Sequence, residues 1–143
     1  MPKSTTFAND ILALIFNATA IADLAENDSS SPATNLYLSL HTADPGVGGS
    51  QTNNETSYTN YARVAVARNA GGWTVASASA ANTALAQFPQ CGVTGATVTH
   101  VAIGTAASGA GKVLYAGALN ASLAVSNLIQ PQFGASALTV SES

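Results

Sequence analysis

The spacing of apolar residues divides the chain into an N-terminal helical segment and a longer β-rich segment. Near the N-terminus apolar side chains recur every three or four residues, which predicts an amphipathic helix over residues 6 to about 25. The residues of this stripe are Phe7, Ile11, Leu14, Ile15 and Ala18, and Leu12 and Phe16 widen it into a broad apolar surface. Ser4, Thr5 or Thr6 can cap the start of the helix. Polar turn-forming residues over 27–32 then end the segment.

From residue 33 onward apolar and polar residues alternate, which is typical of strands. The stretch Asn35–Thr42 places three leucines on one face and Tyr37, Ser39 and His41 on the other. We therefore expect a half-buried strand there, with His41 exposed on its outer face. Similar patterns predict further strands, over residues 61–68, 73–79, 83–88, 96–104, 112–119, 128–133 and 137–141.

The order of these elements predicts an all-β fold with one N-terminal α-helix. Strands do not alternate with helices, so a parallel sheet is not expected, and an antiparallel β-sandwich of jelly-roll type is the best architecture. The length of 143 residues suits a single domain. Within that domain we assign residues 1–27 to the helical segment and residues 33–143 to the sandwich.

One long polar loop interrupts the strands, at Ala43–Asn60. It opens with Asp44-Pro45-Gly46, a turn sequence in which proline presets φ and glycine permits positive φ. Loops of this length in compact domains usually have a function or contact a partner.

The stretch GTAASGAGKV, residues 104–113, resembles a phosphate-binding loop but lacks its essential parts. Val113 stands where a Ser or Thr would bind magnesium, and the following residues have the pattern of a strand, whereas a P-loop requires a helix. We predict a hairpin tip, in which Gly109 and Gly111 supply backbone angles that a tight turn needs, and Lys112 faces solvent or an interface.

The composition is poor in charge, and this limits the possible partners. Charged residues make up 8% of the chain, against about 25% in typical soluble domains. Two interpretations stay open: a neutral soluble surface, or a surface that is covered by other protein. Because the four basic residues form no cluster, we expect no nucleic-acid binding. No apolar run approaches the roughly 18 residues of a membrane span, and the N-terminus only loosely resembles a signal peptide.

The sequence offers little for catalysis. It has two histidines, His41 and His100, and no Gly-x-Ser-x-Gly elbow. Cys91 is the single cysteine, and no cluster of metal-ligating residues accompanies it. We therefore expect neither an enzyme nor a cofactor or metal site. Trp73 and Tyr61 could bind a sugar, but core packing is the more common use of such side chains.

Several blocks of the sequence resemble one family of small virion proteins of tailed bacteriophages. These blocks are LYLSLHTADPGVGGSQTNNE, YARVAVAR, GWTV and THVAIGTAASGAGKVLYAGAL. They are similar to the capsid cement, or decoration, proteins on the outside of phage heads, and related sequences are often labelled tail-fibre proteins. The resemblance covers residues 35 to the C-terminus, and the N-terminal helix departs most from it.

The resemblance implies a jelly-roll-like sandwich that is made in the host cytoplasm and binds the outer capsid surface. Its implied partners are the major capsid protein and further copies of itself, as a dimer or trimer. The helix and the long loop are the expected contact regions, and the residues assigned to them are Phe7, Ile11, Leu14, Ile15, Asp44, Pro45, Gly46 and Tyr58. A charge-poor surface suits this role, because burying charges at each contact is costly. The alternatives are a tail-fibre or receptor-binding module, or a small hydrolase or sugar binder.

Overall fold

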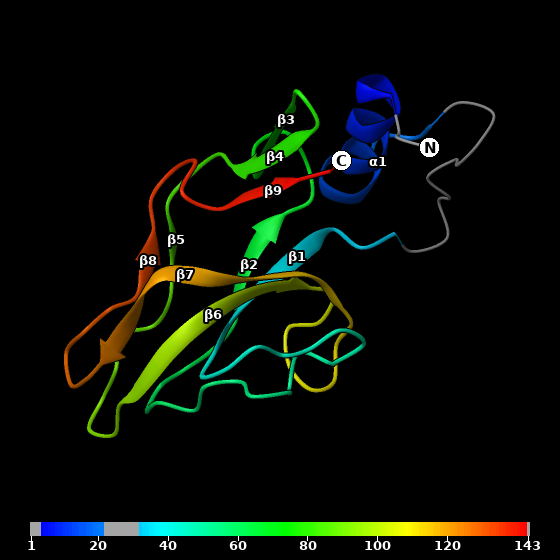
Figure 1. The fold of residues 1–143 in the computed structure, drawn as a ribbon. Helices are drawn as coiled ribbons and strands as arrows, with labels where there is room; N and C mark the ends of the chain where they lie inside the picture. The colour runs from blue at the N-terminus through cyan, green and yellow to red at the C-terminus, as the bar shows by residue number, and fades with distance from the viewer. Residues whose placement is uncertain (1–3, 22–31, 143) are drawn as a thin grey trace. The chain divides into compact units, whose positions relative to one another are not determined.

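The computed structural model describes residues 4–21 and 32–142 (Figure 1). Within these ranges the chain forms one helix and nine strands, and every strand pair with a defined register is antiparallel. The elements are α1 (Thr5–Asn17), β1 (Asn35–His41), β2 (Val64–Ala67), β3 (Trp73–Ala76), β4 (Ser79–Asn82), β5 (Ala86–Gln87), β6 (Ala96–Gly104), β7 (Val113–Val125), β8 (Gln132–Phe133) and β9 (Thr139–Ser141). The all-β antiparallel class with one helix is therefore confirmed.

The strands form three sheets and the chain forms two compact units. The sheet orders are β2-β1-β6-β7, β3-β4-β9 and β5-β8. The first unit, called here the helical unit, contains Met1–Asn35, Val66–Ala86 and Phe133–Ser143. The second, the sheet unit, contains Leu36–Ala65 and Gln87–Gln132. The jelly-roll topology and the single domain stay predictions. No helix in the described ranges is long and apolar enough to cross a membrane.

Helix α1 begins where the sequence indicates but ends earlier than predicted. The Ser4 Oγ accepts a hydrogen bond from the Phe7 amide at 3.2 Å, which makes Ser4 the N-cap. The helix ends at Asn17, because Ala18 adopts a left-handed conformation with φ 54°. The expected extension to residue 25 is therefore wrong up to Ile21, and its remainder lies outside the described residues.

Arg68 completes the C-terminal end of this helix from a distant part of the chain. Its guanidinium donates to the carbonyl oxygens of Leu14 and Ile15, and also to that of Ala33. These helix carbonyls lack partners within the helix, and a cation there also opposes the negative end of the helix dipole. Arg68, which has no charged neighbour in the sequence, thus caps the C-terminal end of α1.

The helix packs through one side of the broad apolar surface that the sequence predicts, the side that contains Leu12 and Phe16. Ala8, Leu12 and Phe16 are the buried residues of α1, and the Phe16 ring meets the Trp73 ring edge-on at 4.6 Å. Trp73 is fully buried, so the core role that we expected for it is confirmed. The predicted stripe lies beside this seam and stays partly exposed, with Phe7 40% exposed.

Two predicted strands, over residues 73–79 and 83–88, differ from the strands in the structure. Residues 73–79 were expected to form one strand, but β3 ends at Ala76 and a hairpin turn at Ser77 and Ala78 leads directly into β4. Both turn residues have positive φ, as the favoured two-residue hairpin turn requires. The Asn9 side chain on α1 accepts a hydrogen bond from the Ala78 amide and holds the turn. The expected strand over 83–88 is reduced to β5.

The sheet unit is centred on β1, β6 and β7. Leu38 pairs with Ile103 in the β1–β6 register, and Ile103 pairs with Tyr115 in the β6–β7 register. Strand β6 has the bounds predicted from the sequence, whereas β7 extends to Val125. The β6–β7 register shifts between Val98 and His100, because Val98 pairs with Leu123 whereas His100 pairs with Ala118. Strand β7 therefore has an irregular bulge at this point. The segment GTAASGAGKV joins these two antiparallel strands, which confirms the hairpin.

Candidate functional site

The long loop folds back against β1 and does not project freely. The Thr42 amide donates to the Asn54 carbonyl at 2.8 Å, and the Thr56 amide donates to the Leu40 carbonyl at 2.9 Å. Near its middle the loop also pairs with the β6–β7 tip, where Ser50 and Lys112 form a bridge. Figure 1 shows this loop running beside the yellow tip at the lower right. The loop thus covers the face of β1 that the sequence indicated to be exposed.

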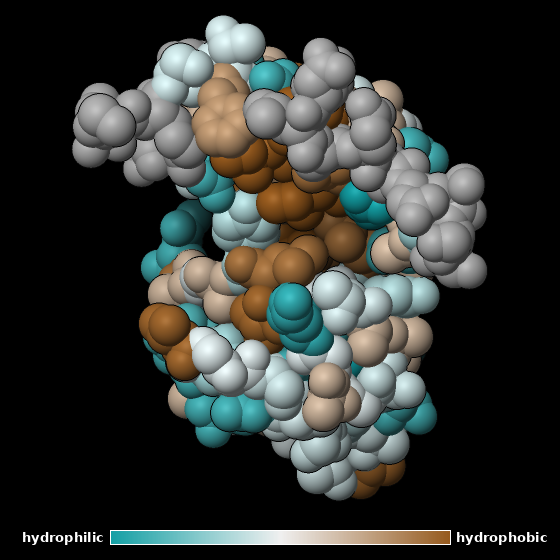
Figure 2. Space-filling view, turned by 90° about the vertical axis from the view of Figure 1, so that its right-hand side faces the viewer, coloured by the Kyte–Doolittle hydropathy of each residue, from teal (hydrophilic) through white to brown (hydrophobic). Residues whose placement is uncertain are grey.

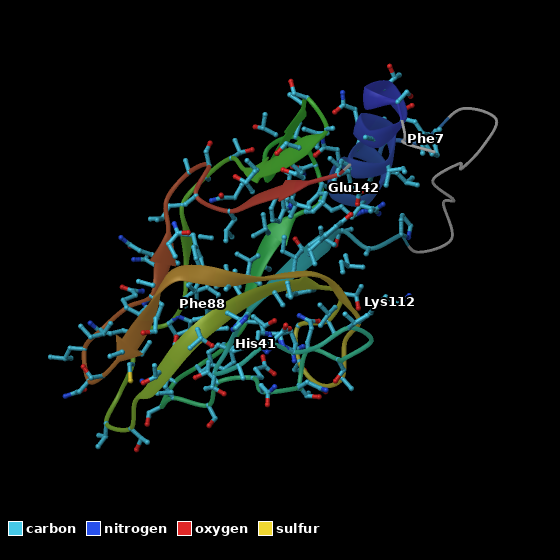
Figure 3. The ribbon with its side chains drawn as sticks, viewed as in Figure 1. Phe7, His41, Phe88, Lys112 and Glu142 are labelled. Carbon is cyan, nitrogen blue, oxygen red and sulfur yellow. The ribbon has the colours of Figure 1, made fainter. Side chains whose placement is uncertain are left out.

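His41 is therefore buried, and the prediction of an exposed His41 is wrong. Its side chain is 0% exposed, and Figure 3 shows it among the side chains of β1 and the covering loop. The ring Nδ1 lies 2.9 Å from the Asn53 carbonyl oxygen, and Nε2 lies 2.9 Å from the Ser39 Oγ. Because a carbonyl oxygen only accepts, Nδ1 carries the proton and Nε2 accepts from the Ser39 hydroxyl. Burial lowers the pKa of His41 below its ordinary value of 6.5, which favours this neutral form.

Gln51 fills the space between the loop and the β6–β7 hairpin. The side chain is fully buried; its Nε2 donates to the Tyr37 carbonyl at 3.3 Å, and its Oε1 accepts from the Ala106 amide at 3.0 Å. Two glycines make room for it: an added Cβ would lie 2.1 Å from the Gln51 Cδ at Gly104, and 2.2 Å from Oε1 at Gly111. Gly109 has the positive φ that the hairpin prediction required. Gly111 is needed instead for the close approach of Gln51.

An ion pair ties the far end of the loop to the same hairpin. Arg63 donates from Nε and Nη2 to the two carboxylate oxygens of Glu55, each at 2.7 Å. The remaining donors of the same guanidinium reach the carbonyls of Ala106 at 2.9 Å and Gly109 at 2.8 Å. The Arg63 side chain is 3% exposed, and the hydrogen bond to Glu55 raises its pKa. A bidentate pair with this burial holds its partners in one geometry.

Tyr61 joins this ion pair to strand β1. Its hydroxyl donates to Glu55 Oε1 at 2.8 Å and accepts from the Leu40 amide at 3.1 Å. Burial raises the pKa of its phenol well above the ordinary value, so Tyr61 stays a neutral donor. Its ring also stacks on Phe88 at 6.3 Å. The sugar-binding alternative for Tyr61 is therefore not favoured, because the side chain is committed inside the unit.

These contacts make a braced loop that presents a small tip. We use "braced loop" for residues 43–60 and "loop tip" for Gly46–Gly49. Val47 at the loop tip is completely exposed, between Gly46 and Gly48, which both have positive φ. Lys112 lies beside the braced loop at the start of β7 and is exposed, as expected (Figure 3). The rigid part of the site is thus buried, and the part available to a partner is the loop tip.

The loop residues predicted to touch a partner differ in their environments. Asp44 and Gly46 are exposed, and the Asp44 carboxylate accepts from the Gly46 amide at 2.8 Å to form the predicted turn. Pro45 is buried. Tyr58 is 2% exposed and donates its hydroxyl to the Pro89 carbonyl at 2.9 Å, and burial raises its pKa to about 12. Tyr58 therefore belongs to the core, because its side chain has almost no surface to offer. The interface as a whole stays a prediction.

Ser39 and His41 have the spacing of a nucleophile and its base, but their surroundings oppose that chemistry. Both side chains are fully buried, and Gln51 Nε2 lies 3.5 Å from the Ser39 Oγ. A nucleophile needs access to a substrate as well as an adjacent base. In the part of the chain that the structure describes, no three His, Cys, Asp or Glu side chains gather as they would around a metal ion. The pair acts as a structural link between β1 and the loop.

These features define a β-rich structural module, and comparison with known proteins gives its class: a structural protein of a bacteriophage virion. Residues 2–141 match the family described as "Podophage GP4 fiber I protein gp80", and the chain belongs to that family. The match includes the N-terminal helix, which the resemblance to cement proteins did not cover. No curated protein matches the chain.

Proposed function

We propose that the protein is a fibre or receptor-binding module of the virion that works by binding and not by catalysis. The observation that carries this proposal is the match of residues 2–141 to a family described as a fiber protein. The braced loop supports it, because a rigid base that presents an exposed tip is typical of recognition loops on β scaffolds. In this proposal the loop tip, with Val47 at its centre, contacts the receptor.

The location of the protein on the virion tests the proposal. Virions carrying a short epitope at the C-terminus are labelled with gold-conjugated antibody and imaged by electron microscopy. Fibre function predicts gold at the fibres of the tail region, and gold spread over the head shell would overturn it. Adsorption supplies a second readout: Val47→Asp at the loop tip should slow attachment to host cells, whereas Leu85→Asp, an equally drastic change at another exposed apolar residue, should not.

Capsid cement is the second candidate, and the low charge of the chain favours it. In the lower part of the face in Figure 2, pale, weakly polar residues predominate and strongly hydrophilic residues are few. Such a surface can pack closely against the major capsid protein or a further copy without burying charges. For this candidate, heads that lack the protein should form but break on heating. Heads that stay equally robust would count against cement and leave fibre function intact.

A further inference from the structure

Two segments at one end of the sheet unit expose a group of apolar side chains. Val93 lies between β5 and β6 and is 88% exposed; Leu128 and Ile129 lie between β7 and β8 and are 67% and 41% exposed. The segments are joined by hydrogen bonds from the Cys91 amide to the Ile129 carbonyl at 2.8 Å and from the Leu128 amide to the Cys91 carbonyl at 2.9 Å. We call Val93, Leu128 and Ile129 the apolar patch.

The backbone at Leu128 is held in an unfavourable conformation. Its φ is +69°, in the left-handed region that a bulky side chain rarely adopts. Besides its amide bond to Cys91, its carbonyl accepts from the Gln90 side chain at 2.9 Å, so both polar groups of the residue are fixed. The exposed side chain gains little from packing within the chain. Residues that the surrounding structure holds in such rare conformations often mark functional sites.

The surroundings of the apolar patch carry almost no charge. Between Arg68 and Glu142 the sequence contains one formally charged residue, Lys112, which lies at the opposite end of β7 from this patch. The exposed polar residues next to the patch in the sequence are uncharged, and they are Gln90, Thr94, Ser126, Asn127 and Gln130. In a symmetric contact each group near the axis meets its own copy, so a charged residue would repel itself, whereas apolar groups and amides can pair with themselves.

We infer that the apolar patch is a self-association surface, on which a second copy of this chain docks. Apolar side chains would form the centre of the contact and the amides its rim, as in other specific interfaces. This inference does not depend on whether the protein belongs to the fibre or the head, because it concerns contacts between identical chains. It also gives a physical reason for Leu128: the strained backbone directs the leucine toward the partner.

Analytical ultracentrifugation of the full chain over a range of concentrations tests the inference. The unmodified protein should self-associate, and Val93→Thr and Leu128→Asn should each weaken self-association by about tenfold or more. Leu85→Asn is the matched control, since Leu85 is 54% exposed but lies in the helical unit, and it should leave self-association unchanged. A protein that stays monomeric at every accessible concentration would overturn the inference, and so would variants of the apolar patch that associate normally.

The melting temperature separates an interface role from a merely structural one. Asparagine tolerates positive φ better than leucine, so Leu128→Asn should raise the melting temperature measured at a dilution where the chain is monomeric. The same variant should lose self-association, so that stability and association change in opposite directions. Val93→Cys should also form a cross-linked dimer on oxidation, whereas Leu85→Cys should not. A lowered melting temperature in Leu128→Asn, or equal cross-linking of both cysteine variants, contradicts the inference.

Discussion

The close contact between Gly111 and Gln51 gives the sharpest test of the braced loop. In Gly111→Ala the new Cβ would lie 2.2 Å from the Gln51 Oε1, which is about 1 Å or more below ordinary van der Waals contact. The Gln51 side chain must then move away from the Ala106 amide, to which it is now bonded at 3.0 Å. Overpacking costs about 1–3 kcal/mol and an unpaired buried polar group costs about 1–3 kcal/mol. We therefore expect Gly111→Ala to lower the free energy of unfolding by about 2–5 kcal/mol.

A double-mutant cycle followed by urea unfolding isolates this contact. Gln51→Ala alone should also destabilise, because the Ala106 amide and the Tyr37 carbonyl lose their partner. In the double variant the clash with Gln51 is gone, although the added Cβ still lies 2.6 Å from the Ala106 Cβ. Its loss of stability should therefore be clearly smaller than the sum of the two single changes. Gly117→Ala is the matched control, because an added Cβ there meets nothing within 4 Å. Single changes that add up within about 0.5 kcal/mol in the double variant would refute the reasoning.

Three further predictions concern the other buried polar contacts. The pKa of His41 is lowered in the folded protein, so the free energy of unfolding should be at its full value above about pH 6.5 and decrease as the pH falls through the folded pKa, because the unfolded chain binds the proton first. Urea unfolding midpoints measured at a series of pH values should show this decrease. His41→Gln should make the midpoint depend less on pH. Arg63→Lys should lower the free energy of unfolding by about 2–4 kcal/mol and speed amide hydrogen exchange at the β6–β7 hairpin tip. The reason is that lysine cannot make both the bidentate pair with Glu55 and the hydrogen bonds to the hairpin carbonyls. Unchanged exchange at the hairpin tip would contradict the role of Arg63 in holding the loop to the hairpin. Arg68→Met should lower helicity in circular dichroism by removing the bonds to the α1 carbonyls.

Alternation in the sequence predicted the central strands because each has one apolar face. The bounds of β6 and the start of β1 follow directly from that pattern. The turn at Ser77 and Ala78 could not be read in the same way, because neither residue is one that usually adopts positive φ. Their left-handed conformation is fixed by the hydrogen bond from the Ala78 amide to Asn9, which lies far away in the sequence. Tertiary contacts of this kind leave no local signal.

The candidate site was predictable only in part, because its polar residues are buried. The length of the Asp44–Asn60 loop pointed to the right segment, but its composition indicated exposure throughout. His41 and Gln51 can be buried because each of their polar groups has a partner on the loop, on β1 or on the β6–β7 hairpin, and hydrophobicity patterns do not reveal such partners. Gly104 and Gly111 were the available signal, since two glycines that bracket a hairpin can mark the close approach of another side chain.

The braced loop separates the residues that determine its shape from the residue that it displays. Val47 is fully exposed, while Gln51, Glu55 and Arg63 fix the loop to the β6–β7 hairpin through buried hydrogen bonds. A substitution at Val47 therefore carries little stability penalty. Under the proposed receptor-binding function, selection by different hosts could act on this position while the fold is preserved. The same separation makes the loop tip a suitable place to graft a foreign peptide, with the two flanking glycines retained to keep the backbone angles of the turn.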